Sequence, residues 1–390
     1  MQKTPDINPL TTSQSLFLDL VRLVAAQVVV VAHLSEWLYH PFAKSDQAPK
    51  SFAYYFGYFI YESEKMGAYA VAFFFVLSGF LISKSIYKSH HTNGFNLRDY
   101  ILNRVARLLP TLLVAVFLSL CVYYIIYTFN LFGLHNYTLS DPSVNFPRSS
   151  ANTKIGTTVA TALFLNGMIG VPGINLGTMN INGPLGTLAQ EFWFYICAGL
   201  FAWGFFKQNK WAIIAAIGFI IWQSIFGNFL WLVGFLIWIL GVISAQVKWR
   251  REHIPSLVIS SLLSIIIVLK MNHSSPVSLL ERLILGVSAF LILNSGLAIF
   301  RNLNIGSSII KNGASYTYTL YAIHWPCIVL FVAFCGPQLS SWSPILKAII
   351  YSCLFIGINF LAYLISRWSE DVPRWRNLIF KFKSSSKQSV

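Results

Sequence analysis

Three ionisable residues interrupt the long apolar stretch from Leu16 to Leu34, LFLDLVRLVAAQVVVVAHL: they are Asp19, Arg22 and His33. A charged side chain at the bilayer centre costs ~2.5 to 3.5 kcal/mol on insertion scales, so such residues normally face a protein-lined cavity and serve a function. Arg22 and His33 are eleven residues apart, which places them on one helix face, roughly 16 Å apart along the axis. One helix would therefore carry a cation, able to hold an anion, near one membrane surface and an imidazole, able to exchange a proton, most of the way to the other.

A second group of cations lies in RDYILNRVARLLP, residues 98–110. Arg104 and Arg107 are three residues apart and so share one face of a helix. Paired guanidiniums suit phosphate oxygens, which predicts a phosphate clamp. The local sequence by itself favours the alternative, in which these charges only anchor a helix end on the cytoplasmic side.

A carboxylate surrounded by aromatic residues lies in TLAQEFWFY, residues 187–195. Glu191 in a membrane helix must be paired, protonated or exposed to a water-filled cavity. Aromatic faces such as that of Trp193, together with a carboxylate, are a common way to hold a sugar. The alternative is a structural Glu191 that a partner on another helix neutralises.

A polar stripe lies in SYTYTLYAIHWP, residues 315–326, because Thr317, Tyr321 and His324 follow helical spacing. Pro326 predicts a kink just after the histidine. His324 is either part of a site or a satisfied core residue. Ser78-Gly79, in FFFVLSGFLIS, also has two interpretations. Its small residues either allow close helix packing or form a kink that faces a ligand.

The composition explains why these residues must be read in a membrane. The 390 residues are 56% hydrophobic and only 11% charged, whereas a soluble domain has about 25% charged residues. The formal net charge of +15 is spread over loops between apolar stretches, which argues against nucleic-acid binding. The five cysteines have no metal-binding spacing, and we expect no metal site.

Ten apolar stretches are candidates to span the membrane. They are residues 16–35, 67–86, 111–130, 184–206, 211–228, 230–247, 256–271, 279–299, 314–334 and 344–366. With the N-terminus in the cytoplasm, nineteen of the 28 Lys and Arg residues lie inside, eight lie outside, and Arg22 is in the membrane. The sequence therefore predicts an all-α, polytopic membrane protein with about ten transmembrane helices and both termini cytoplasmic.

Two polar regions complete the expected organisation. The outside segment 131–183 is rich in Asn, Gly, Ser, Thr and Pro, which predicts a flexible loop, with a short interfacial or re-entrant piece at 155–165. The tail after Phe380, KFKSSSKQSV, predicts a disordered basic end near anionic membrane lipids.

Taken together, the motifs resemble the acyltransferase-3 family of bacterial integral-membrane acyltransferases. The family's R-x10-H pattern is represented by Arg22 and His33, and the five further motifs in order are FFFVLSGFLIS, RVARLLP, TLAQEFWFY, SYTYTLYAIHWP and SEDVP (369–373). The resemblance predicts one membrane acyltransferase domain, residues 15–370, with short cytoplasmic tails at 1–14 and 377–390. It looks like the stand-alone form, without an appended hydrolase-like domain.

The resemblance implies O-acetyl transfer from cytoplasmic acetyl-CoA to a hydroxyl of a cell-surface or lipid-linked polysaccharide, in the bacterial inner membrane. Arg22 and His33 would be the catalytic residues, with His33 as the general base or a transient acyl carrier. Arg104, Arg107 and Ser78 would bind the donor, and Arg22 would also meet the anionic CoA. Residues at the acceptor end would be Glu191, Trp193, Tyr321 and His324. A homo-oligomer and partners in glycan assembly remain open.

Two other functions fit the same pattern. A glycan or lipid transporter or flippase would also have about ten spans with polar residues near the midplane. A structural scaffold in a glycan-assembly complex would tolerate changes at Arg22 and His33 without effect.

Overall fold

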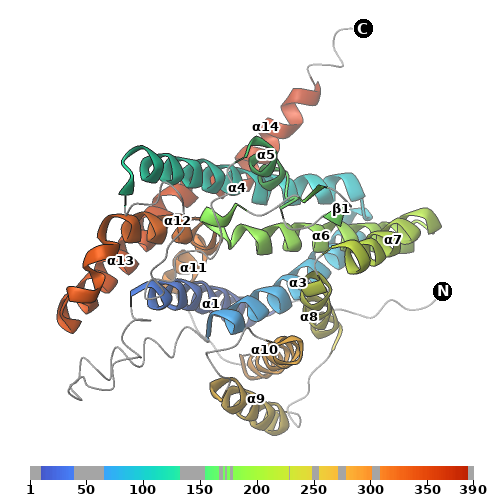
Figure 1. Cartoon of the computed structure of the whole chain (residues 1–390). Helices are drawn as coiled ribbons and strands as arrows, with labels where there is room; N and C mark the ends of the chain where they lie inside the picture. Colours follow the sequence, from blue (N-terminus) through green and yellow to red (C-terminus); the bar gives the residue numbers. More distant parts are fainter. Residues whose placement is uncertain are drawn as a thin grey trace.

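The computed structural model describes residues 10–38, 66–131, 154–166, 170–171, 174–175, 179–227, 229–247, 254–270, 278–300 and 308–384. These residues form a bundle of packed α-helices, with one pair of very short strands (Figure 1). Each predicted span corresponds to one helix. In chain order these are α1 (Thr12–Leu38), α3 (Met66–Asn93), α4 (Leu97–Thr128), α6 (Leu185–Phe206), α7 (Lys210–Phe226), α8 (Phe229–Gln246), α9 (Ile254–Leu269), α10 (Leu279–Ile299), α12 (Thr317–Cys335) and α13 (Pro344–Ser369).

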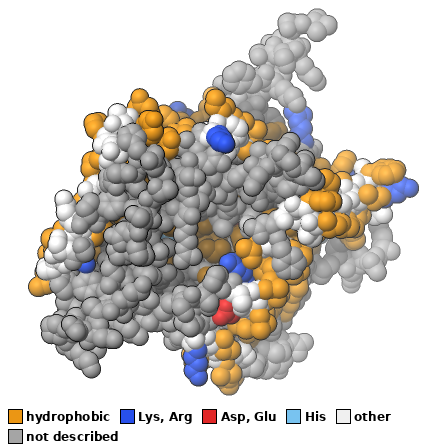
Figure 2. All heavy atoms as spheres, in the orientation of Figure 1, with side chains coloured by type: hydrophobic (Ala, Val, Ile, Leu, Met, Phe, Trp, Pro, Cys, Tyr) orange, Lys and Arg blue, Asp and Glu red, His pale blue; other side chains and the backbone are white. Residues whose placement is uncertain are grey.

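Six of the described helices are long and apolar enough to cross a membrane, namely α1, α3, α4, α10, α12 and α13. Shorter apolar helices occupy Lys210–Phe226, Leu230–Gln246 and Leu257–Ile267. Large apolar side chains are exposed along α7, α9 and α13, among them Ile225, Leu262 and Ile356. Figure 2 shows such side chains at the right of the view, where α7 projects from the bundle. A protein surface this apolar belongs in lipid, and the prediction of an all-α polytopic membrane protein is confirmed.

The remaining elements are short. They are α5 (Ile155–Ala162), β1 (Gly170–Val171), β2 (Ile174–Asn175), η4 (Asn180–Asn182), α11 (Ser308–Ala314), η7 (Gly336–Ser341) and α14 (Val372–Ser384). The strands pair antiparallel, with Gly170 opposite Asn175. The short piece expected at 155–165 is α5, and much of the expected flexible loop around it lies outside the described residues.

The expected disorder after Phe380 is wrong for the first part of the tail. Helix α14 continues to Ser384, and residues 385–390 lie outside the described part. The helix packs against α4, and Trp375 donates from its indole Nε1 to the carbonyl of Trp368 at 3.0 Å. Apolar residues recur along α14 at helical spacing, which composition alone did not reveal.

Helix α4 contains both the Arg104–Arg107 segment and the third predicted span. Asn96 caps its start by accepting a hydrogen bond from the Asp99 amide at 3.2 Å, and the helix continues through Pro110 into the third span. Arg104 and Arg107 therefore lie on the same continuous helix as the membrane-crossing segment. Helix α12 likewise continues through Pro326.

A close crossing of α3 and α8 holds the wall of the central region. A Cβ added to Gly79 would overlap the carbonyl oxygen of Trp238, and one added to Gly241 would overlap that of Val76. The two backbones therefore touch at a pair of glycines. This supports the packing interpretation of the Ser78-Gly79 notch.

Candidate functional site

A cavity of about 110 Å³ lies where α1, α3, α4, α6 and α12 meet. Its polar and aromatic lining consists of Arg22, Ser78, Arg104, Arg107, Thr187, Glu191, Tyr195, Thr317, Tyr318 and Tyr321. Apolar side chains of α3, including Phe74 and Phe75, complete the wall. The structure thus brings six predicted site residues to one cavity: Arg22, Ser78, Arg104, Arg107, Glu191 and Tyr321.

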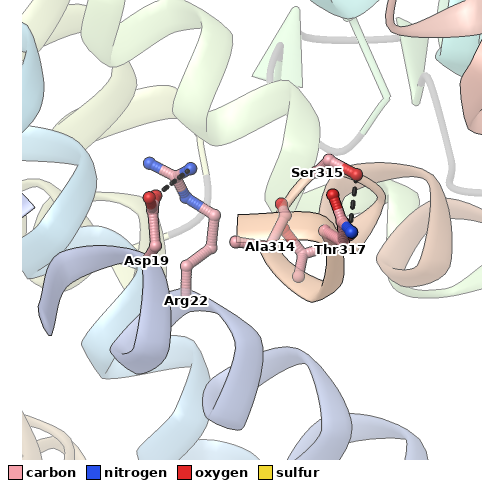
Figure 3. A network of polar contacts seen from close by, with 6 residues as sticks. Asp19, Arg22, Ala314, Ser315 and Thr317 are labelled. Carbon is pink, nitrogen blue, oxygen red and sulfur yellow. Dashed lines mark hydrogen bonds and ion pairs between the residues drawn. The ribbon is translucent and has the colours of Figure 1, made fainter. Parts of the chain in front are cut away.

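Arg22 is held at the cavity by its neighbour on the helix. Its Nη1 lies 3.4 Å from Oδ1 of Asp19, and about a quarter of each side chain is exposed, 22% and 26%. Figure 3 shows this pair beside the turn from Ala314 to Thr317 that leads into α12. Arg107 lies near enough for its charge to act on Arg22. Two like charges at one cavity favour an anion between them.

Arg104 is fixed by aromatic faces. Its guanidinium carbon lies 5.4 Å from the ring centre of Tyr100 and 5.8 Å from that of Tyr195. Nη2 donates to Oγ of Ser85 at 2.9 Å, while the buried Nε has no hydrogen-bond partner. A buried N–H without an acceptor is costly, so Arg104 keeps unused hydrogen-bonding capacity beside the cavity.

Glu191 is the end of a directed chain of hydrogen bonds. The indole Nε1 of Trp238, which can only donate, contacts Ser78 Oγ at 3.2 Å. Ser78 then donates to the Tyr195 hydroxyl at 3.1 Å, and Tyr195 donates to Oε1 of Glu191. The chain orients the Glu191 carboxyl at the cavity wall. Ser78 borders the cavity, but its hydroxyl is engaged in this chain.

Trp193 does not line the cavity. Its Nε1 donates to the carbonyl of Phe164 at 2.8 Å, and its ring stacks on Phe219 with centroids 4.7 Å apart. Two residues along a helix from Glu191, it faces away from that carboxyl. The structure therefore separates these two residues, which we expected to form one pocket.

Two histidines meet beyond the cavity. His33 Nδ1 lies 2.8 Å from His324 Nε2, and His324 Nδ1 lies 3.1 Å from the carbonyl oxygen of Leu320. The planes of the two imidazole rings differ by 2°. The rings of His33 and Trp325 meet edge to face, with their centroids 4.7 Å apart. His324 is fully buried, at 0% exposure. Neither histidine lines the cavity.

Tyr321 stands between the cavity and the histidines. Its hydroxyl lies 2.5 Å from Thr187 Oγ1, and its ring centre lies 5.8 Å from that of His324. Tyr321 thus contacts both the cavity that the three arginines line and the imidazole pair. Among the described residues, no group of three or more His, Cys, Asp or Glu side chains is placed to hold a metal ion.

Comparison with known proteins identifies this arrangement. A family model described as an acyltransferase domain matches residues 15–364. The chain belongs to this acyltransferase family. An O-acetyl transferase of Shigella phage Sf6 is 31% identical over 202 residues, covering 52% of this chain. The match spans 50% of that protein, about half the length of the curated relative. No solved structure matches the acyltransferase.

The matched range contains all cavity-lining residues of this acyltransferase and both histidines. Its helices α1 and α12, which carry the R-x10-H pattern and the SYTYTLYAIHWP motif, pack against each other. The resemblance to the acyltransferase-3 family is therefore confirmed.

Glu370 is a carboxylate at the site that we did not single out, although it lies in the SEDVP motif. Its Oε1 accepts hydrogen bonds from Thr319, at 2.9 Å from the amide and 2.6 Å from Oγ1. Burial raises the pKa of the Glu370 carboxyl, while these bonds and the charges of Arg107 and Arg22 oppose that rise. The adjacent acidic residues Glu370 and Asp371, directly after the last span, were the available signal. Trp238, Tyr195 and Thr187 were also missed, because their roles depend on contacts between helices.

Proposed function

We propose that this acyltransferase moves an acetyl group from acetyl-CoA to a hydroxyl of a cell-surface or lipid-linked polysaccharide, in the bacterial inner membrane. One observation carries the proposal. Three arginines border the cavity, and a histidine pair, of which His324 is fully buried, lies next to Tyr321 in its wall.

The arginines suit the donor. Coenzyme A carries phosphate groups, and guanidiniums bind phosphate oxygens through charge-assisted, forked hydrogen bonds. Arg22 and Arg107 supply facing positive charges, and Arg104 has a buried Nε without an acceptor. Glu191 is the single carboxylate among the cavity-lining residues, against three guanidiniums.

His33 suits the transfer step. In this step the imidazole takes the proton of the acceptor hydroxyl while the hydroxyl oxygen attacks the thioester carbonyl. The carbon–sulfur bond then breaks, and the coenzyme A thiolate leaves and receives that proton from the imidazolium. The products are an acetyl ester and a free thiol, and His33 returns to its starting state.

Two cavity residues suit a sugar as the acceptor. Glu191 and Tyr321 present a carboxylate and a hydroxyl to the cavity, and such groups hydrogen-bond sugar hydroxyls. The phage relative is named an O-acetyl transferase, which favours a hydroxyl as acceptor.

Mass spectrometry of surface glycans from cells with and without the chain tests this function. We expect acetyl esters to be missing from an otherwise normally exported glycan when the chain is deleted, and restored by the parent sequence. His91→Ala replaces an exposed histidine at the cytoplasmic end of α3 and serves as a matched control that should restore the acetyl esters. Loss of glycan export would instead support a transporter, and an unchanged acetyl content would contradict the proposal.

A further inference from the structure

We infer that His324 is a positioning residue, which fixes the hydrogen on Nδ1 of His33 and leaves Nε2 of His33 as the proton-accepting atom. The inference rests on the proposed function, because it concerns the base in the transfer step. The contact between His33 and His324 joins α1 to α12.

The backbone of α12 decides the first hydrogen. The Leu320 carbonyl can only accept, and His324 Nδ1 lies 3.1 Å from it. Nδ1 of His324 must therefore carry a hydrogen. His324 is fully buried, and no carboxylate is among the contacts that the structure describes for it. An unpaired buried charge is strongly disfavoured, so the ring is neutral and its Nε2 keeps a lone pair.

The second hydrogen follows from the first. Because His324 Nε2 can only accept, the 2.8 Å contact requires a hydrogen on His33 Nδ1. The neutral His33 ring then has its lone pair on Nε2. The planes of the two rings differ by only 2°, which suits a hydrogen bond directed along the lone pair of the acceptor nitrogen.

This order of hydrogens gives His324 a defined effect on the reaction. When His33 Nε2 takes the proton of the acceptor hydroxyl, the positive charge that develops on the ring is shared with the bond from Nδ1 to His324. The proton then passes from Nε2 to the leaving thiolate, and the bond between the rings stays intact. Both nitrogens of His324 are already occupied, so a sugar hydroxyl would have to displace one of these bonds to reach it.

Two amide variants separate positioning from proton transfer. In His324→Gln the side-chain oxygen reaches the position of Nε2 and can accept from His33. In His324→Asn the shorter side chain reaches only the position of Nδ1, so the bond to His33 is lost. An amide is neither protonated nor deprotonated near neutral pH, so position 324 cannot act as an acid or a base in either variant. Both variants therefore replace the imidazole by an amide, and they differ in whether the hydrogen bond to His33 is kept.

The measurement is acetyl transfer to glycan in membranes, with kcat and the KM for acetyl-CoA determined for each full-length variant. We expect His324→Gln to keep kcat within about tenfold of the parent and His324→Asn to lose about a hundredfold or more, with the KM for acetyl-CoA unchanged in both. Equal, severe losses in both variants would show that His324 itself carries the proton. Parental kcat in both would show that it has no positioning role. Either result overturns the inference.

A direct readout covers the case in which an amide variant does not accumulate. In nitrogen-15 NMR of the histidine-labelled parent in lipid, with the signal assigned by its loss in His33→Ala, His33 should be protonated on Nδ1 and not on Nε2. The opposite tautomer contradicts the inference. A parent that transfers no acetyl group at all contradicts the proposed function instead, and the two failures are therefore distinct.

Discussion

The indole Nε1 of Trp238 donates to Ser78 Oγ at 3.2 Å, at the point where α8 crosses α3. This bond starts the chain that continues through Tyr195 to the Glu191 carboxyl. Ser78 was predicted to serve the donor, so two roles for the same hydroxyl can be compared.

Removing either partner of the bond between Trp238 and Ser78 tests this series of hydrogen bonds. A neutral hydrogen bond contributes about 1 kcal/mol, so Ser78→Ala and Trp238→Phe should each lower kcat/KM for the glycan about fivefold. The KM for acetyl-CoA should not change, because the chain ends on Glu191 and not on the arginines. Trp222→Phe, at a 41% exposed indole, is the control. A raised KM for acetyl-CoA in Ser78→Ala would favour donor contact.

The same crossing should be sensitive to a single methyl group. Gly241→Ala would drive a Cβ into the carbonyl of Val76, so we expect a loss of about 1–3 kcal/mol of folding free energy. Gly218→Ala on α7 meets nothing within 4 Å and should be neutral or slightly stabilising. Thermal unfolding in detergent measures both. Equal melting temperatures for the two variants would mean that the helices do not approach this closely.

Arg107 separates donor binding from membrane anchoring. Hydrogen bonds to charged groups contribute about 1.5–3 kcal/mol, so Arg107→Ala should raise the KM for acetyl-CoA tenfold or more at unchanged abundance. Arg98→Ala, at an exposed position of the same helix, removes a positive charge away from the cavity. Lost abundance of Arg107→Ala with parental KM in the remaining protein would support the anchoring alternative.

The Glu370 carboxyl should make stability depend on pH. Burial raises its pKa above the ordinary value of 4.5, so the folded chain favours the neutral form. Its stabilising contribution is complete below that ordinary value and is lost as the pH rises through the folded-state pKa. Relative to Glu370→Gln, the parent should lose melting temperature as the pH rises from acidic to neutral. Parallel curves for the two proteins would be inconsistent with this explanation.

Much of the fold followed from the sequence because spans and helix faces are local properties. Apolar stretches located the ten longer helices α1, α3, α4, α6–α10, α12 and α13, and the spacing of Arg104 and Arg107 placed both at one cavity. The pairing of His33 with His324, 291 residues apart, was not predictable, since periodicity identifies a face but not the helix it meets. The same limit applies to Trp193, whose aromatic type suggested a sugar contact while its helix turns it toward Phe219.

The central claim is that His33 performs acetyl transfer at a site where arginines hold the donor. Labelled acetyl-CoA given to membranes that contain the acceptor glycan tests it most directly. We predict that His33→Ala lowers label transfer about a hundredfold or more while acetyl-CoA still binds and protein abundance is unchanged. Label transfer by His33→Ala equal to that of the parent would contradict the account.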